Sequence, residues 1–150
     1  MILVEISGDM KKILAKTMVK EHPDDFSIVY IDPQQDEKAR TLLRDLRHFS
    51  SITYTSEEVS VVLRSGDWVD LRGNFPGYKE EGPYRLLTFD IVLDLSIVGF
   101  LSVVSTALAD AGVSIYALST YLKDHILVKK RDAPLAVSVL KGLISEAKSE

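Results

Sequence analysis

Apolar and polar positions repeat with two different periods along the chain, and each change of period marks a predicted change of element. Residues 2–6 form a short apolar run that predicts a first strand. Residues 9–21 place apolar side chains at helical spacing behind Asp9, which predicts a helix with this aspartate as its N-cap. Residues 26–31 are branched and aromatic, and an Asp-Pro pair follows them, so we expect a strand that ends there.

Segments with these two periods continue to the middle of the chain. Apolar residues between positions 39 and 46 recur at helical spacing and predict a second helix. Residues 49–55 and 59–64 predict two strands joined by a tight turn. Residues 65–83 contain six glycines and prolines, so we expect a connection there, with at most short strands around Trp68 and Leu71.

A similar pattern starts again in the second half of the chain. The predicted elements are a strand over residues 85–94, a helix from Phe100 to Ala111 ended by Gly112, strands over residues 113–121 and 125–129, and a last helix that starts near Asp132 and accommodates Pro134 in its first turn.

Both halves therefore share the order strand, helix, strand, tight turn, strand, over residues 26–64 and 85–129. Two βαββ units with a closing helix predict an α+β, ferredoxin-like fold with antiparallel sheets and helices on one face. The other face of such a sheet must be covered. We therefore expect pairing within the chain, between chains, or both, and a homodimer in solution.

Composition narrows the classes of function. The 150 residues carry 18 basic and 22 acidic side chains, a net charge of -4, so a nucleic-acid partner is not expected. The chain has no cysteine, which excludes disulfides and thiolate chemistry and fits a cytoplasmic protein. The apolar run near the first residue is too short for a signal peptide or a membrane helix, so no membrane association is expected.

Catalytic motifs are missing from the sequence. It has no nucleophile elbow, no zinc-protease motif, no P-loop and no dinucleotide-binding glycine pattern. His22, His48 and His125 are far apart in sequence, and we interpret each as a partly exposed surface or strand-end residue. We therefore expect no enzyme, no metal and no cofactor.

Two segments stand out as candidate binding residues. The first is the connection between a strong strand and a strong helix, where a glycine allows close backbone approach and the helix start offers unpaired N–H groups to a carboxylate. It runs from Asp94 to Phe100, and the residues expected to contact a ligand are Ser96, Ile97, Val98, Gly99 and Phe100. The alternative is that the glycine only permits a tight connection.

The second segment lies at the end of the following strand, where Thr120, Tyr121 and Asp124 cluster around a turn. Hydroxyls and a carboxylate there can hold an ammonium group, although the same residue types also suit ordinary strands and turns. In a β-α-β fold the two segments meet at one corner of the sheet, so we expect them to form one site.

The chain from residue 49 to about 147 resembles the ACT-domain proteins related to the CASTOR-type arginine sensors. The matching segments are residues 87–90, 99–101, 108–113 and 117–129, of which the last is the most specific. The resemblance implies two partly intertwined units, a degenerate one over residues 1–84 and an ACT domain over residues 85–150. It also implies binding of a free amino acid where ACT units pair.

Carried over by position, Gly99 lies against the ligand backbone, Thr120 and Tyr121 flank it, and Asp124 contacts a cationic group. Lys123 departs from the family pattern, because a lysine folded inward would neutralise Asp124. The leading hypothesis is a non-catalytic regulatory module that senses an amino acid and acts on a protein target. The alternatives are an oligomerisation scaffold without a ligand and, third, an enzyme, which the fold alone does not exclude.

Overall fold

A computed structural model of the chain describes residues 6–149, which divide into two compact units. The central unit comprises residues 23–84, and the terminal unit comprises, of the described chain, residues 6–22 together with residues 85–149. Residues 6–22, which the sequence grouped with the N-terminal half, belong to the same compact unit as residues 85–149. The chain therefore passes from one unit to the other twice.

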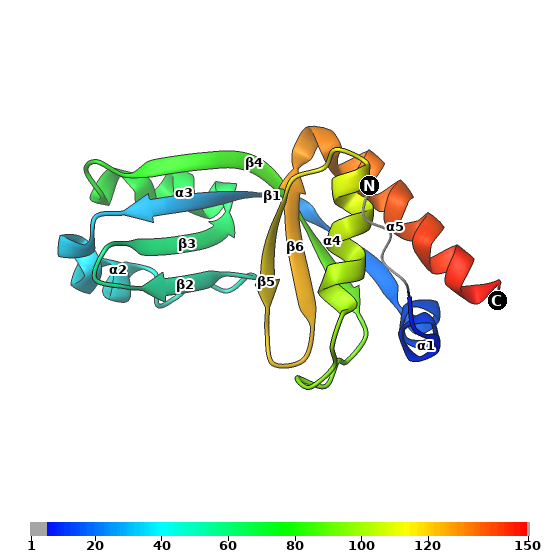
Figure 1. Cartoon of the computed structure of the whole chain (residues 1–150). Coiled ribbons are helices and arrows are strands. Elements are labelled where there is room, and N and C mark those ends of the chain that lie inside the picture. Colours follow the sequence, from blue (N-terminus) through cyan, green and yellow to red (C-terminus); the bar gives the residue numbers. More distant parts are fainter. Residues whose placement is uncertain (1–5, 150) are drawn as a thin grey trace. The chain divides into compact units, whose positions relative to one another are not determined.

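The elements follow the chain as labelled in Figure 1. In order they are α1 (Gly8–Lys16), β1 (Met18–Ile31), η1 (Pro33–Gln35), α2 (Asp36–Leu42), β2 (Ser51–Tyr54), β3 (Val59–Arg64), α3 (Ser65–Leu71), η2 (Arg72–Asn74), β4 (Lys79–Asp90), α4 (Phe100–Asp110), β5 (Ile115–Ser119), β6 (Asp124–Lys129), η3 (Lys130–Asp132) and α5 (Ala133–Lys148).

The central unit is a complete βαββαβ motif with strand order β2-β3-β1-β4. Val61 of β3 lies between Val29 of β1 and Ile52 of β2 in antiparallel register. The alternate side chains of these strands are branched and apolar, which suits one buried face. With Trp68 of α3 and Phe75 they form the core of this unit.

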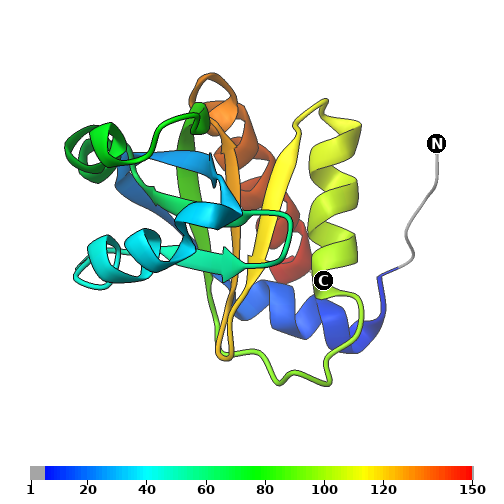
Figure 2. The same ribbon diagram turned by 90° about the vertical axis from the view of Figure 1, so that its left-hand side faces the viewer.

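The terminal unit has the strand order β1-β4-β6-β5, in which β5 and β6 form an antiparallel hairpin. Its helices α1, α4 and α5 pack on one face of these strands (Figure 2). The buried side chains that join helices and strands include Leu14, Leu87, Phe89, Phe100, Leu108, Ile126, Val128 and Leu140.

This arrangement confirms the ferredoxin-like fold, with each unit built from a β-α-β-β order and helices that connect its strands. The long strands β1 and β4 are neighbours in the sheet, and both run from one unit into the other. The fourth strand of the terminal unit is therefore the first part of β1, and more than 60 residues separate it from the part of β4 that belongs to the same unit.

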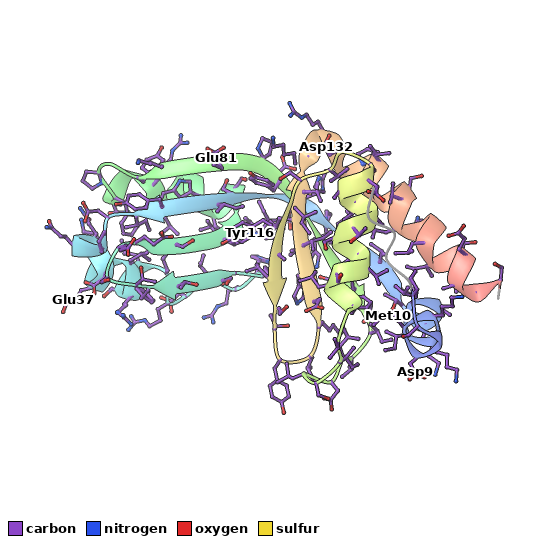
Figure 3. All side chains as sticks on the ribbon, in the orientation of Figure 1. Asp9, Met10, Glu37, Glu81, Tyr116 and Asp132 are labelled. Atoms are coloured by element: carbon purple, nitrogen blue, oxygen red, sulfur yellow. The ribbon has the colours of Figure 1, made fainter. Side chains whose placement is uncertain are left out.

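The first helix differs from its prediction at both ends. Ser7, not Asp9, is the N-cap, because its hydroxyl accepts a hydrogen bond from the N–H of Met10 at 3.1 Å. Asp9 lies in the exposed first turn and Met10 points inward (Figure 3). The helix ends at Lys16 instead of continuing to residue 21, since residues from Met18 onward pair as a strand.

The connection predicted over residues 65–83 was also wrong, because residues 65–71 form α3. The guanidinium of Arg64 donates two hydrogen bonds to the Asp67 carboxylate across the first turn, both at 3.1 Å. Trp68 is fully buried, stacked on Phe75 and edge-on to Tyr78. Burial of one large side chain therefore fixes a helix that local glycines disfavour.

Most of the other predicted elements agree with the structure within a few residues, but the strand predicted over residues 26–31 starts eight residues earlier, at Met18. The helix after residue 99 is α4, and Gly112 follows it with a φ of +78°, the left-handed conformation of a helix stop. The strand predicted over residues 85–94 runs from Lys79 and ends at Asp90. The strand predicted over residues 2–6 lies outside the described residues except for Ile6, which is not in a strand.

Candidate functional site

A cavity of about 290 Å³ opens in the terminal unit between the connection from β4 to α4 and the turn from β5 to β6. Both views of the ribbon show these two segments side by side (Figures 1 and 2). The cavity is lined by Leu93, Asp94, Leu95, Ile97, Gly99, Phe100, Leu101, Ser102, Ser119, Thr120, Lys123 and Asp124.

The β4–α4 connection is held by a local turn at Asp94. Its carboxylate accepts hydrogen bonds from the N–H of Ser96 at 2.8 Å and from the Ser96 hydroxyl at 2.6 Å. These bonds from Ser96 lower the pKa of the Asp94 carboxyl. The carbonyl of Asp94 also accepts the N–H of Ile97 at 3.0 Å, so the chain is turned back before α4 begins.

Gly99 is the N-cap of α4 and has a φ of +99°, a conformation that other residues adopt only with strain. No side chain caps this end of the helix. The first backbone bond of the helix runs from Val103 to the Gly99 carbonyl, so the N–H groups of residues 100–102 precede the helical ladder. Because these residues line the cavity, its wall carries hydrogen-bond donors and the positive end of the helix dipole.

The β5–β6 turn supplies the opposite wall. Thr120 donates two hydrogen bonds to the carbonyl of Lys123, one from its N–H and one from its hydroxyl, both at 2.9 Å. The hydroxyl of Ser119 donates to the carboxylate of Asp124 at 2.7 Å. This wall therefore presents oxygen atoms in a fixed arrangement.

Two bonds tie the walls together. The N–H of Leu93 donates to the carbonyl of Leu122 at 2.9 Å, and the ammonium of Lys123 lies 2.6 Å from the Asp90 carboxylate. The hydrogen bond from Lys123 lowers the pKa of the Asp90 carboxyl. Lys123 is thus paired with Asp90, and the structure shows no ion pair between its ammonium and Asp124 in the described part of the chain.

The structure brings five of the eight predicted site residues to this cavity: Ile97, Gly99, Phe100, Thr120 and Asp124. The other three do not line it. Ser96 is bonded to Asp94, while Val98 and Tyr121 point outward with 89% and 79% of their surface exposed. Asp94 and Ser119, which also line the cavity, begin the two segments that stand out in the sequence, whereas Leu93 and Ser102 were not singled out as binding residues.

His125 was expected to be partly exposed, but it is buried, with 8% of its surface accessible. Its Nδ1 lies 2.8 Å from the hydroxyl of Thr88, and His22 Nε2 lies 2.9 Å from the same hydroxyl. Its Nε2 lies 3.1 Å from the hydroxyl of Thr120 at the cavity wall. Burial, followed by the nearby His22, lowers the pKa of His125.

Part of the chain matches a known domain family. Residues 80–142 match the family model of the ACT domain. This match covers less than half of the chain and agrees with the ACT resemblance of the sequence. No curated protein sequence matches the chain.

Solved structures share the fold over most of the chain. A protein of unknown function from Vibrio cholerae, described as a possible transport protein, has a TM-score of 0.71 at 19% identity and covers 92% of this chain and 99% of its own. A protein from Agrobacterium tumefaciens has a TM-score of 0.69 at 21% identity, with coverages of 85% and 89%. The ligand-free regulatory subunit of aspartate kinase from Thermus thermophilus has a TM-score of 0.64 at 14% identity, with coverages of 85% and 97%.

The described residues show neither of two further features, a membrane-spanning helix and a cluster of metal ligands. Between residues 6 and 149, no helix has both the length and the apolar character needed to cross a membrane. Within the same range, no three histidine or acidic side chains are grouped as a metal ion would require.

Proposed function

We propose that the chain is a non-catalytic regulatory protein whose terminal unit binds a free amino acid in the cavity between α4 and the β5–β6 turn. One observation carries this proposal. A single cavity joins the uncapped N-terminus of α4, which favours a carboxylate, to a wall of oxygen atoms that includes Asp124, which favours an ammonium. These two ends are complementary to the zwitterion of an amino acid.

The pairing of Lys123 with Asp90 supports a cationic group beside Asp124. If Lys123 instead folded onto Asp124, the two charges would cancel at the cavity wall. Because the structure pairs Lys123 with Asp90 at 2.6 Å, the Asp124 carboxylate keeps its charge for a ligand. The volume of about 290 Å³ lies at the lower end of the range of small-molecule sites, as a free amino acid requires.

The ACT match and the likeness to the regulatory subunit of aspartate kinase support a regulatory role over a catalytic one. The narrower resemblance to CASTOR-type arginine sensors is part of this proposal and makes a basic amino acid the first candidate. A protein target that responds to the ligand belongs to the same proposal.

A thermal-shift screen of the purified chain against the free amino acids tests this function. A ligand present at about 100 times its dissociation constant adds about 2.7 kcal/mol to the free energy of unfolding, which raises the melting temperature measurably. We expect one amino acid or one chemical class to produce this shift. No shift with any of them at millimolar concentration would contradict the proposed function.

A scaffold that only assembles copies of the chain is the second candidate, and exposed apolar residues favour it. Leu95, Val98, Tyr121 and Leu122 are each at least half exposed, and all four lie on the two segments that border the cavity. An apolar surface of this kind is typical of a protein–protein contact.

We propose that a second copy of the chain covers this apolar surface, so that the cavity lies at an ACT–ACT interface.

We therefore expect the chain to be a homodimer in solution, measurable by light scattering coupled to size-exclusion chromatography. Replacing Val98, 89% exposed, by aspartate should give a monomer, because the partner would have to bury a charge. The matched control is Val69→Asp on α3, which is also exposed but lies in the central unit and should remain dimeric. A monomeric wild type would contradict the predicted assembly.

A further inference from the structure

The hydroxyl protons around the cavity have one consistent arrangement, which follows from their acceptors. The Thr120 hydroxyl donates its proton to the carbonyl of Lys123, and a carbonyl can only accept. The same oxygen must therefore accept its bond from His125, whose Nε2 carries the hydrogen. A neutral imidazole with hydrogen on Nε2 has a bare Nδ1, so that nitrogen accepts the hydroxyl proton of Thr88.

The proton of the neighbouring Ser119 hydroxyl can be assigned in the same way. The Ser119 hydroxyl gives its proton to the carboxylate of Asp124, which only accepts hydrogen bonds. We call Ser119, Thr120 and Asp124 the acceptor corner. All three line the cavity, and each has lone pairs left for a ligand but no proton to offer.

We propose that His125 is a positioning residue that keeps the acceptor corner without a proton to donate, so that the corner binds a cation rich in N–H groups, an ammonium or a guanidinium. Protonation of His125 in acid then weakens this binding. The inference rests on the proposed function and extends it to the polarity and the pH response of the site. His125 acts through Thr120. Because the His125 Nε2–H donates to the Thr120 hydroxyl oxygen, that hydroxyl donates its own hydrogen bond to the Lys123 carbonyl.

Several polar and charged groups surround His125. They are His22 from β1, the uncharged Thr88 from β4 with Asp90 two residues further along that strand, Lys123 from the turn and Asp124 from β6, while its register partner on β5 is Leu118. Of these groups, Asp124 favours an imidazolium at His125, while His22 and Lys123 disfavour it. A ligand cation competes for that same carboxylate.

The direction of the pH effect follows from this competition. A cation bound at the acceptor corner disfavours a second positive charge on His125, one hydroxyl away, and by linkage a charged His125 disfavours the cation. Burial already favours the neutral imidazole. The pKa of His125 lies below the ordinary histidine value of about 6.5, so the affinity is constant at neutral pH and decreases only as the pH falls through this lowered midpoint.

The ligand-free protein provides the first test. Nitrogen-15 NMR of the histidine side chains at pH 7.5 should show hydrogen on Nε2 of His125, and a pH titration should give His125 a midpoint below the ordinary histidine value of about 6.5. Hydrogen on Nδ1, or a midpoint at or above that value, would overturn the proposal. Because no amino acid is added, this result is separate from success or failure of the proposed function.

The second test uses L-arginine as the probe, since it carries both an ammonium and a guanidinium. Calorimetry should show weaker affinity at pH 5.5 than at pH 7.5, by a factor set by the midpoint of His125 in the ligand-free protein. His125→Gln keeps an N–H and a carbonyl without a titratable charge, so its affinity should be equal at both pH values. His125→Leu removes the bond to Thr120 and should weaken binding at both.

His48→Gln is the matched control and should keep the wild-type pH response, because His48 is exposed and lies in the central unit. Equal wild-type affinities at pH 5.5 and 7.5, or an unchanged pH response in His125→Gln, would overturn the proposal. Absence of L-arginine binding at both pH values would overturn the cation assignment. If the amino-acid screen is then also negative, the proposed function fails with it, and the NMR result alone decides the role of His125 toward Thr120.

Discussion

Replacing Asp124 by alanine is expected to weaken amino-acid binding by about ten- to a hundredfold. The carboxylate lies at the cavity wall, and a charge-assisted hydrogen bond of the kind it would make to a ligand ammonium is worth about 1.5–3 kcal/mol. Titration calorimetry on the wild type and on Asp124→Ala, with the amino acid that gives the thermal shift, measures the change. Asp124→Asn keeps the shape of the side chain but removes its charge, and it should lose most of the same affinity.

Asp124 also accepts the hydroxyl proton of Ser119 in the turn, so its removal has a structural effect as well. We expect that effect to be a small loss of stability, because an exposed turn bond rarely supports a core. Asp70→Ala, on the exposed side of α3 in the central unit, is the matched control and should bind as the wild type does. Equal affinities of wild type and Asp124→Ala would remove Asp124 from the site.

Truncation of Trp68 to alanine should cost about 3–5 kcal/mol of the free energy of unfolding, the largest stability effect that we expect from one substitution. Trp68 has no exposed surface and packs between Phe75 and Tyr78, so the variant leaves a cavity in the core of the central unit. Urea unfolding followed by circular dichroism measures the loss.

Trp68→Phe should lose clearly less. Among the described residues the indole N–H of Trp68 has no hydrogen-bond partner, so phenylalanine removes a buried unpaired donor together with part of the volume. Val69→Ala, at the exposed neighbouring position on the same helix, should change stability by no more than about 0.5 kcal/mol. A loss below 1 kcal/mol in Trp68→Ala would show that α3 does not depend on this side chain.

The cavity could be predicted from the sequence because its two segments lie next to elements with strong periodicity. Gly99 stands between an alternating strand and a regular helix, and Thr120 begins a short turn between two strands. Once the β-α-β order is recognised, topology alone brings these segments to one edge. The partners of single side chains could not be predicted, since the pairing of Lys123 with Asp90 joins residues 33 positions apart.

Two elements escaped prediction for a shared reason, which is that long-range contacts override local preference. Residues 17–21 have a composition that permits a helix, yet Met18 begins a strand that pairs with β4 about 60 residues later. Residues 65–71 include a glycine, yet Trp68 buries them as α3. His125 was misjudged because its burial depends on Thr88 and His22 from other strands.

The passage of β1 and β4 through both units also sets the order in which the chain can complete its structure on the ribosome. Helix α1 leaves the ribosome before α5, the helix against which it packs, which starts more than 100 residues later. At ordinary synthesis rates that delay is on the order of ten seconds. Throughout it, Met10 and Leu14 lack the apolar neighbours that α5 supplies to the core of the terminal unit, so this unit cannot complete its core while the chain is being made.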